Sequence, residues 1–261
     1  MPQGGTVQRG TTDQLAAPPA ELLRGASLFL DFDGTLVEIA DRPDAVQVDE
    51  RLHKLIASLV TALDGRVALI SGRPAGEVRS FLGGGAEPGF AIAGSHGMEF
   101  LWADGHRTAA ERPASLEQVH EAMTALAAEN PGVMVEDKPL GAALHFRQAP
   151  EAEEACRALA TKLADVHGLK LQPGKMLFEV RTTGGDKGRA IATFLEKPEY
   201  AGTRPVFIGD DTTDEPGFAM AARLGGAGIL VGTARDTSAT YLLAGVPETL
   251  DWLTQATEAL A

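Results

Sequence analysis

Short apolar runs alternate with helix-spaced segments in two stretches of the chain, residues 25–105 and 182–261. The apolar runs, such as Ala26-Ser-Leu-Phe-Leu and Val67-Ala-Leu-Ile, predict buried strands. We expect strands at 26–30, 67–70, 90–94, 206–209 and 229–231, and helices at about 49–63, 187–195, 237–244 and 248–259. Alternation of this kind indicates a parallel α/β sheet that is covered on both faces.

Residues 106–181 show a different pattern, with paired strands and two longer helices. Ser115, followed by Gln118, predicts a capping box at the start of one helix, and a second helix is expected at 151–167. Strand pairs are expected at 134–138 with 142–147, around a turn at 139–141, and at 170–172 with 176–181, around a turn at 173–175. The sequence therefore predicts an α+β domain of roughly 75 residues inserted into the α/β core.

Composition and charge narrow the class of protein. The chain has 261 residues, of which 44% are hydrophobic and 23% charged, as in soluble globular proteins of one or two domains. It shows no unbroken apolar stretch of membrane-helix length and no secretory-signal pattern. The net charge of −13 argues against nucleic acid or an anionic membrane as the main partner. A small anion is still possible, since a bound cation and a few basic residues can reverse the sign inside one cleft.

Two further features bear on the location of the protein and its limits. The single cysteine, Cys156, excludes an intrachain disulfide and fits a reducing cytoplasm, where we expect the protein to work. Residues 1–24 are rich in Gly, Thr, Gln, Pro and Ala, which predicts a loose leader before the first strand.

Candidate chemistry begins where the first predicted strand ends, in the string Asp31-Phe32-Asp33-Gly34-Thr35. Ligands of open parallel sheets bind beyond the carboxyl ends of the strands, so a site is expected here. Two carboxylates this close repel each other unless a proton or a cation intervenes, which suggests a bound hard metal. The alternative is an ordinary Asp-Gly turn.

Polar residues follow other strand and helix ends in the same way. Ser71, with Gly72 and Arg73, offers a hydroxyl and backbone N–H groups to a phosphate oxygen, or else caps the next helix. Lys187 opens a helix, where the helix dipole disfavours a cation, so either another force places it there or it is a surface lysine.

The densest acidic cluster is Asp210, Asp211 and Asp214, at the end of a strand and the start of a helix. The helix dipole favours acids at such a position, which is one explanation for them. The other is that these carboxylates join Asp31 in an oxygen-rich magnesium site. The recurrence of such residues at strand ends favours a functional site.

This constellation resembles the haloacid dehalogenase (HAD) superfamily of phosphohydrolases, whose four motifs correspond to DFDGT, the strand ending in Ser71, Lys187 and GDDTTDE. Within it the chain resembles the trehalose-6-phosphate phosphatase family, in the strings DFDGTLVEIA, LISGRP, AGSHGMEF, VEDKPLGAALHFR, GKMLFEVR, DKGRAI and GDDTTDE. The resemblance implies a Rossmann-like parallel-sheet core, residues 25–105 and 182–261, with an inserted α+β cap domain at 106–181.

The resemblance also implies catalytic roles. Asp31 would attack phosphorus, and Asp33 would protonate the leaving sugar oxygen and then activate water. Magnesium would be held by Asp31, the Asp33 carbonyl, Asp210 and Asp214. Ser71 and Lys187 would bind the transferring phosphoryl group.

Substrate-binding residues are expected in both parts of the chain. The cap would recognise the sugar through Glu136, Lys138, Glu179 and, in the same region, His145, Arg147 and Lys175. In the core, Thr35, Gly72, Arg73, His96 and Asp211 are the further expected substrate-binding residues. Glu136 and Lys138 point the same way on a predicted strand, although they could also be solvated charges, and His145 and Arg147 could instead brace the fold.

The implied function is Mg2+-dependent hydrolysis of trehalose 6-phosphate through an aspartyl phosphate, by a monomer paired functionally with a trehalose-phosphate synthase. The alternatives are a related phosphatase for sucrose, mannosylglycerate or glucosylglycerate phosphate, and a non-catalytic sugar-phosphate-binding module. One position departs from the family, in which Pro commonly follows the Arg of the EVR string. Here Thr182-Thr183 follows Arg181, at the expected hinge between cap and core.

Overall fold

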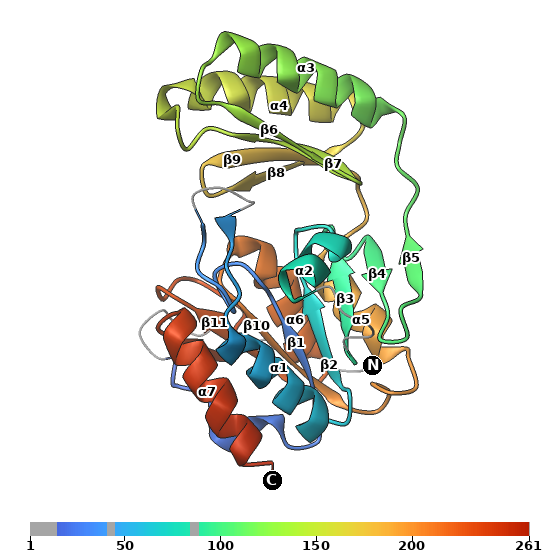
Figure 1. Ribbon diagram of the computed structural model, residues 1–261, viewed down its shortest axis with the longest axis vertical. Helices are drawn as coiled ribbons and strands as arrows, with labels where there is room; N and C mark the ends of the chain where they lie inside the picture. Colours follow the sequence, from blue (N-terminus) through green and yellow to red (C-terminus); the bar gives the residue numbers. More distant parts are fainter. Residues whose placement is uncertain (1–14, 41–44, 84–88, 261) are drawn as a thin grey trace, which may run out of the picture. The chain divides into compact units, whose positions relative to one another are not determined.

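The computed structural model describes residues 15–40, 45–83 and 89–260 (Figure 1). The chain forms two compact units, one made of residues up to Arg107 and from Asp186 onward, the other spanning Thr108–Gly185. The insertion expected at 106–181 differs from the second unit by a few residues at each end.

The first unit is built on a predominantly parallel sheet with the strand order β12-β11-β10-β1-β2-β3-β4-β5. All strands from β12 to β3 run parallel, and β4 is antiparallel to β3. The strands are β1 (Ala26–Leu30), β2 (Val67–Ile70), β3 (Ala91–Gly94), β4 (Glu99–Leu101), β5 (Arg107–Ala109), β10 (Arg204–Gly209), β11 (Ala227–Val231) and β12 (Tyr241–Leu243).

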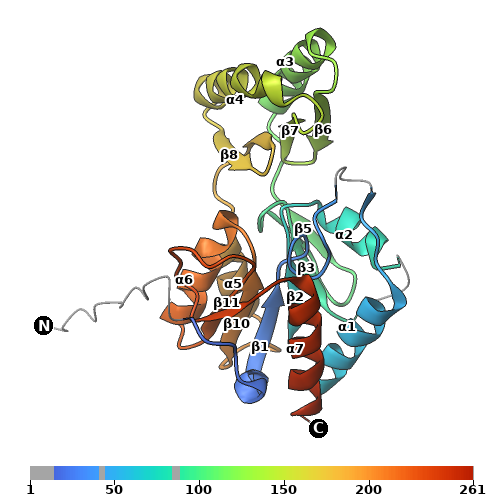
Figure 2. The same ribbon diagram turned by 90° about the vertical axis from the view of Figure 1, so that its left-hand side faces the viewer.

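Helices cover both faces of this sheet, so every residue of β1 and β2 is buried. On one face, Leu28 and Leu30 of β1 pack in a cluster with α1 (Glu50–Ala62), α2 (Ala75–Phe81) and α7 (Val246–Glu258). On the other, Phe29 packs with α5 (Lys187–Leu195) and α6 (Glu215–Arg223). Figure 2 shows α5 and α6 on the opposite side of the sheet from α1 and α7. This confirms the α/β core predicted from the apolar runs.

The strand order places a topological switch point beside β1. From β1 the chain continues outward through β2 and β3, whereas β10, β11 and β12 build the other half of the sheet. β1 pairs with both β2 and β10, and the crevice at the carboxyl ends of β1 and β10 is where parallel sheets bind ligands.

The second unit contains an antiparallel sheet of order β6-β7-β9-β8, packed against two helices. Ala142, Leu144, Phe178 and Val180 lie in one cluster with residues of both helices. Because side chains alternate along a strand, the residues between them face away from the helices. The elements are α3 (Ser115–Glu129), β6 (Met134–Lys138), β7 (Gly141–His145), the 3-10 helix η3 (Pro150–Ala152), α4 (Glu153–His167), β8 (Lys170–Gly174) and β9 (Leu177–Arg181).

Several expectations about local structure were wrong. The helix expected near 237–244 is a loop and the edge strand β12, whose Tyr241 pairs with Ile229 of β11. The capping box at Ser115 does not form, because Ala114 is the N-cap and Ser115 is already helical. The turn expected at 173–175 instead falls after β8, and Pro173 lies within this edge strand, where a missing N–H is tolerated.

The leader expected at 1–24 also extends too far. Residues 1–14 lie outside the described residues, but 15–24 pack against the core. The 3-10 helix η1 (Ala20–Leu23) buries Leu22 and Leu23, and Trp252 donates a hydrogen bond from Nε1 to the Pro18 carbonyl at 2.9 Å. Burial of the two leucines and the hydrogen bond to Pro18 hold this segment on the core, although its composition is typical of a loop.

Candidate active site

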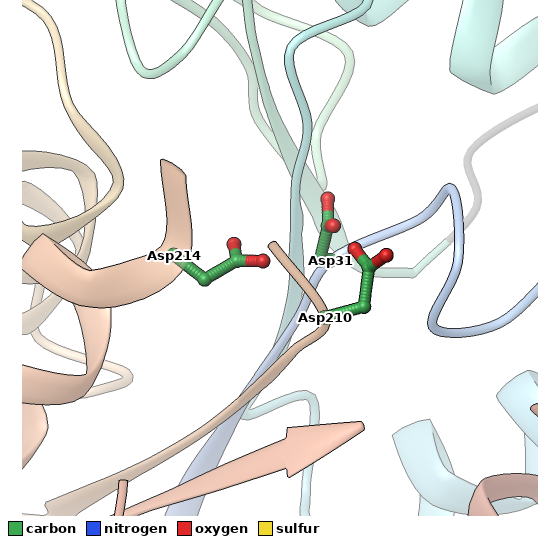
Figure 3. A group of neighbouring side chains, drawn as sticks. All are labelled: Asp31, Asp210 and Asp214. Carbon is green, nitrogen blue, oxygen red and sulfur yellow. The ribbon is translucent and has the colours of Figure 1, made fainter. Parts of the chain in front are cut away.

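Three carboxylates meet at the carboxyl ends of β1 and β10. Asp31 follows β1, Asp210 follows β10, and the Asp31 N–H donates to the Ile208 carbonyl at 2.9 Å, which holds the two strand ends together. Asp214 belongs to the short 3-10 helix η4 (Thr212–Asp214) just beyond. Figure 3 shows the three side chains converging, and each offers an oxygen within 4.8 Å of the others.

Lys187 joins this cluster from the first position of α5. Its Nζ lies 2.6 Å from Asp31 Oδ1 and 2.5 Å from Asp214 Oδ1, and the ammonium is buried. The attraction of these two carboxylates explains why a lysine stands at a helix start, where the helix dipole disfavours a cation.

Burial and neighbouring charges shift the pKa of Asp31 and that of Lys187. Burial raises the pKa of Asp31 well above its ordinary value, and the attraction of Lys187 only partly opposes this, since Asp214 and Asp210 add repulsion. Burial alone would lower the pKa of Lys187, but Asp214 and Asp31 outweigh it and raise that pKa.

Two glycines make room for the acids. A Cβ on Gly34 would lie 2.2 Å from Asp210 Oδ2, and one on Gly209 would lie 2.3 Å from Asp214 Cγ. Contacts this short do not occur, so any side chain at either position would displace a carboxylate. Gly34 also has φ of +78°, which favours glycine for a second reason.

Asp33 is held by Arg73 through a two-pronged ion pair. Arg73 Nε lies 2.7 Å from Asp33 Oδ2, and Nη2 lies 2.9 Å from Oδ1. The same guanidinium contacts Glu77 and lies over the Phe81 ring, 5.1 Å from its centre. Although burial opposes the charge of Arg73, the hydrogen bonds and charge of Asp33 outweigh it and raise the Arg73 pKa. Arg73, expected as a substrate-binding residue, thus orients the carboxylate of Asp33.

The expected phosphate-binding segment and the His96 loop are linked through their backbones. Ser71 Oγ accepts from the Arg73 N–H at 3.1 Å, and the Ser71 carbonyl accepts from the His96 N–H at 3.0 Å. Ser95 and His96 both have positive φ, 49° and 57°, which is uncommon outside glycine. The His96 ring lies directly against Gly72, where a Cβ would come within 2.8 Å of it. The structure therefore places Ser71, Gly72 and His96 side by side.

Thr35 and Asp211 are the two remaining core residues that were expected to bind substrate. Thr35 is fully buried in the turn after β1. The Asp211 carboxylate accepts from the Thr212 N–H at 2.6 Å and completes a reciprocal capping arrangement with Asp214. Its observed contacts are those of a helix cap.

In the second unit, four residues expected to bind sugar line up on the helix-free face of the sheet. Lys138 Nζ lies 3.1 Å from Glu179 Oε2 and 3.7 Å from Glu136 Oε2, and His145 Nε2 lies 2.8 Å from the same Glu136 oxygen. Burial raises the pKa of Glu136, but the hydrogen bond from His145 and the charge of Lys138 outweigh it and lower that pKa overall. Lys175 lies apart in sequence, in the exposed turn between β8 and β9, and Arg147 follows β7.

Two residues of the first unit were missed by sequence reasoning. Glu215 follows the acidic cluster, and Arg235 lies in the loop after β11; the two form an ion pair beside Asp211. Glu215 is part of the GDDTTDE string, but nothing in the pattern around Arg235 distinguishes it from a surface arginine.

No helix in the described part of the chain is long and apolar enough to cross a membrane. Within the same residues, Asp31, Asp210 and Asp214 form the one group of three side chains suited to holding a metal.

Comparison with known proteins gives consistent matches. The family model described as trehalose-phosphatase matches residues 29–247. A trehalose-6-phosphate phosphatase from Escherichia coli is 39% identical, over 95% of this chain and 92% of that protein. A probable trehalose-phosphate phosphatase from Sinorhizobium fredii is 38% identical, over 79% of this chain and 77% of that protein. A crystal structure of a trehalose-6-phosphate phosphatase related protein superposes with a TM-score of 0.74 at 25% identity, covering 89% of this chain and 97% of the other.

Proposed function

The chain belongs to the trehalose-phosphatase family, and we propose that it hydrolyses trehalose 6-phosphate to trehalose and phosphate through an aspartyl-phosphate intermediate. The observation that carries this proposal is the position of Asp31, a buried carboxylate at a sheet switch point, 2.6 Å from the Lys187 ammonium. A nucleophile in that position can attack a phosphate whose negative charge the lysine offsets.

The reaction divides into two displacements at phosphorus. In the first, an Asp31 carboxylate oxygen forms a bond to phosphorus while the bond to the sugar oxygen breaks, and Asp33 gives that oxygen a proton. In the second, water attacks phosphorus, Asp33 takes its proton, and the Asp31 carboxylate is restored. In the structure Arg73 contacts both oxygens of the Asp33 carboxylate, so this two-pronged contact must open at one oxygen before Asp33 can give or take a proton.

The acidic cluster fits a hard divalent cation, Mg2+ above all. Carboxylate oxygens are the ligands such cations prefer, and the three carboxylates each offer an oxygen within 4.8 Å of the others. The residues that would hold the ion are Asp31, Asp210 and Asp214, with the Asp33 carbonyl. When bound, Mg2+ would neutralise charge on the transferring phosphoryl group. Ser71 would donate a hydrogen bond to a phosphate oxygen.

Sugar recognition is assigned to the second unit, at Glu136, Lys138, His145 and Glu179. These groups are ordered by one another and largely buried, so their polar atoms are preorganised for hydroxyl groups of the glucose that carries no phosphate. We further propose that the protein acts in the cytoplasm as a monomer, on trehalose 6-phosphate supplied by a synthase.

The proposal is tested by measuring phosphate release from a panel of sugar phosphates, in Mg2+ and after its removal with a chelator. The panel contains trehalose 6-phosphate, the phosphates of sucrose, mannosylglycerate and glucosylglycerate, and a small generic phosphate ester. We expect trehalose 6-phosphate to be preferred and all turnover to need the metal. Better turnover of another sugar would refute the substrate assignment, and binding without turnover would indicate a non-catalytic module.

The cap assignment has its own test in Glu136→Ala. We expect kcat/KM for trehalose 6-phosphate to fall by about tenfold or more, since a lost charged hydrogen bond is worth roughly 1.5–3 kcal/mol. Hydrolysis of the generic ester should be unchanged. The matched control is Asp137→Ala, the next residue of β6, whose side chain points to the opposite face. An equal loss on both substrates would contradict the assignment.

A further inference from the structure

The loop after β10, which carries the acidic cluster, is held by hydrogen bonds from the loop after β11. The Asp211 carbonyl accepts two hydrogen bonds, from the Asp214 N–H at 3.0 Å and from Arg235 Nη2 at 2.8 Å. Asp211 stands between Asp210 and Asp214, both in the metal-suited group. Arg235 therefore contacts the backbone at the centre of the segment that sets the spacing of two carboxylates.

Glu215 completes this contact from the start of α6. Its Oε1 accepts from Arg235 Nη1 and from Thr237 Oγ1, the latter at 2.8 Å, and its Oε2 accepts from the Ser238 N–H at 2.8 Å. Both carboxylate oxygens are thus used to tie the loop after β11 to the loop after β10. The side chains of Arg235 and Glu215 are 26% and 28% exposed.

We propose that Glu215 and Arg235 form a brace that positions Asp210 and Asp214 for metal binding, a role for two residues outside the metal cluster itself. Asp214 is fixed on one side by Lys187 through its carboxylate, and on the other by the brace through the Asp211 peptide. A partly exposed ion pair adds little to the free energy of unfolding. We therefore expect the Glu215–Arg235 pair to act mainly on the position of the loop that carries Asp210 and Asp214. Groups that orient metal ligands typically change metal affinity by ten- to a hundredfold when removed. The inference rests on the proposed Mg2+ requirement.

The test is direct Mg2+ binding to the metal-free, full-length protein, measured by calorimetry for wild type and Arg235→Met. We expect the variant to bind Mg2+ at least about tenfold more weakly. The matched control is Arg51→Met, which breaks an exposed pair of similar kind, Arg51 Nη2 to Asp251 Oδ1 at 2.5 Å, between α1 and α7. Its Mg2+ affinity should equal that of wild type.

The outcomes separate this inference from the proposed function. Wild-type affinity in Arg235→Met would overturn the brace and leave the proposed function standing. A wild-type protein that binds no Mg2+ would overturn both. If Arg235→Met does not fold, Arg235→Lys decides, because one ammonium cannot reproduce the fork that reaches both Glu215 and the Asp211 carbonyl. A several-fold weaker affinity supports the brace, and an unchanged affinity overturns it.

Discussion

Replacing Gly34 by alanine tests whether the close packing of Asp210 on this backbone determines the metal site. The added Cβ would lie 2.2 Å from Asp210 Oδ2 and 2.5 Å from its Cγ, whereas ordinary contacts begin near 3.4 Å. The carboxylate or the turn must therefore move by roughly 1 Å. Ligand distances in metal sites are held to about 0.2 Å, so a shift of this size should weaken binding strongly.

A second glycine separates the clash from the backbone cost. Gly202 has nearly the same φ, +76° against +78°, but a Cβ there would meet nothing within 4 Å. Gly202 lies just before the start of β10, whereas Asp210 directly follows the other end of that strand. Gly202→Ala should lose only the left-handed conformational energy, about 1–2 kcal/mol. Gly34→Ala should lose this and about 1–3 kcal/mol more from overpacking.

Urea unfolding of the metal-free proteins measures the two stability losses, and Mg2+ titration of phosphate release measures the metal site. We expect Gly34→Ala to require at least about tenfold more Mg2+ for half-maximal activity, and Gly202→Ala to need the wild-type concentration. If the two variants lose the same stability and show the same Mg2+ requirement, the packing of Asp210 on Gly34 does not set the site.

Three further predictions concern the same cluster. Asp31→Asn should abolish turnover yet raise the melting temperature of the metal-free protein at pH 7. Because burial raises the pKa of Asp31, the stability it contributes is full below its unfolded pKa, near 3.8, and is lost as pH rises towards the folded value. The gap between variant and wild type should thus close on acidification, and a gap independent of pH would contradict this. Lys187→Met should cost about 3–5 kcal/mol in urea unfolding, since it leaves buried carboxylates without their cation. The control Lys54→Met, which breaks an exposed pair, should cost no more than about 0.5 kcal/mol, and similar losses would refute the reasoning. Gly209→Ala should cost about 1–3 kcal/mol, because its Cβ would lie 2.3 Å from Asp214 Cγ; an unchanged unfolding midpoint would show that Asp214 can move aside freely.

The parts of the fold that the sequence predicted well are those whose apolar spacing is set by burial on one or both faces. The strands at 26–30 and 67–70 were predicted with their observed bounds, as was the helix at 187–195. Continuous apolar runs and helical spacing are set by burial alone, so they can be read locally. The strand at 241–243 was missed because an edge strand of three residues carries too little pattern, and its pairing with β11 is a tertiary contact.

The site residues likewise fall into those that a local pattern indicates and those that depend on a contact between distant parts of the chain. Spacing relative to strand ends was enough to expect Asp31 and Asp210 near one another, because parallel strands end at one edge of the sheet. Lys187 opens a helix, so its place in the site was implied only by the family resemblance. The partner of Arg73 was not predictable in this way. It contacts Asp33, 40 positions away, and a motif with a basic residue near a phosphate site suggests phosphate binding first. Arg235 contacts Asp211 across 24 positions, with no motif of its own.

Each unit contains one buried lysine between two carboxylates, and the difference in their surroundings indicates different ligands. Lys187 lies between Asp31 and Asp214, and Asp210 adds a third carboxylate with an oxygen within 4.8 Å of theirs. Three carboxylates at this spacing suit a hard divalent cation such as Mg2+. Lys138 lies between Glu179 and Glu136, and there the fourth member is His145, which contacts Glu136. Its carboxylate oxygens and its nitrogens offer both acceptors and donors, which is the basis of the proposal that it binds the uncharged hydroxyl groups of a sugar. The two lysine–carboxylate arrangements therefore differ in their additional residue, which is a third carboxylate, Asp210, in one and an imidazole, His145, in the other.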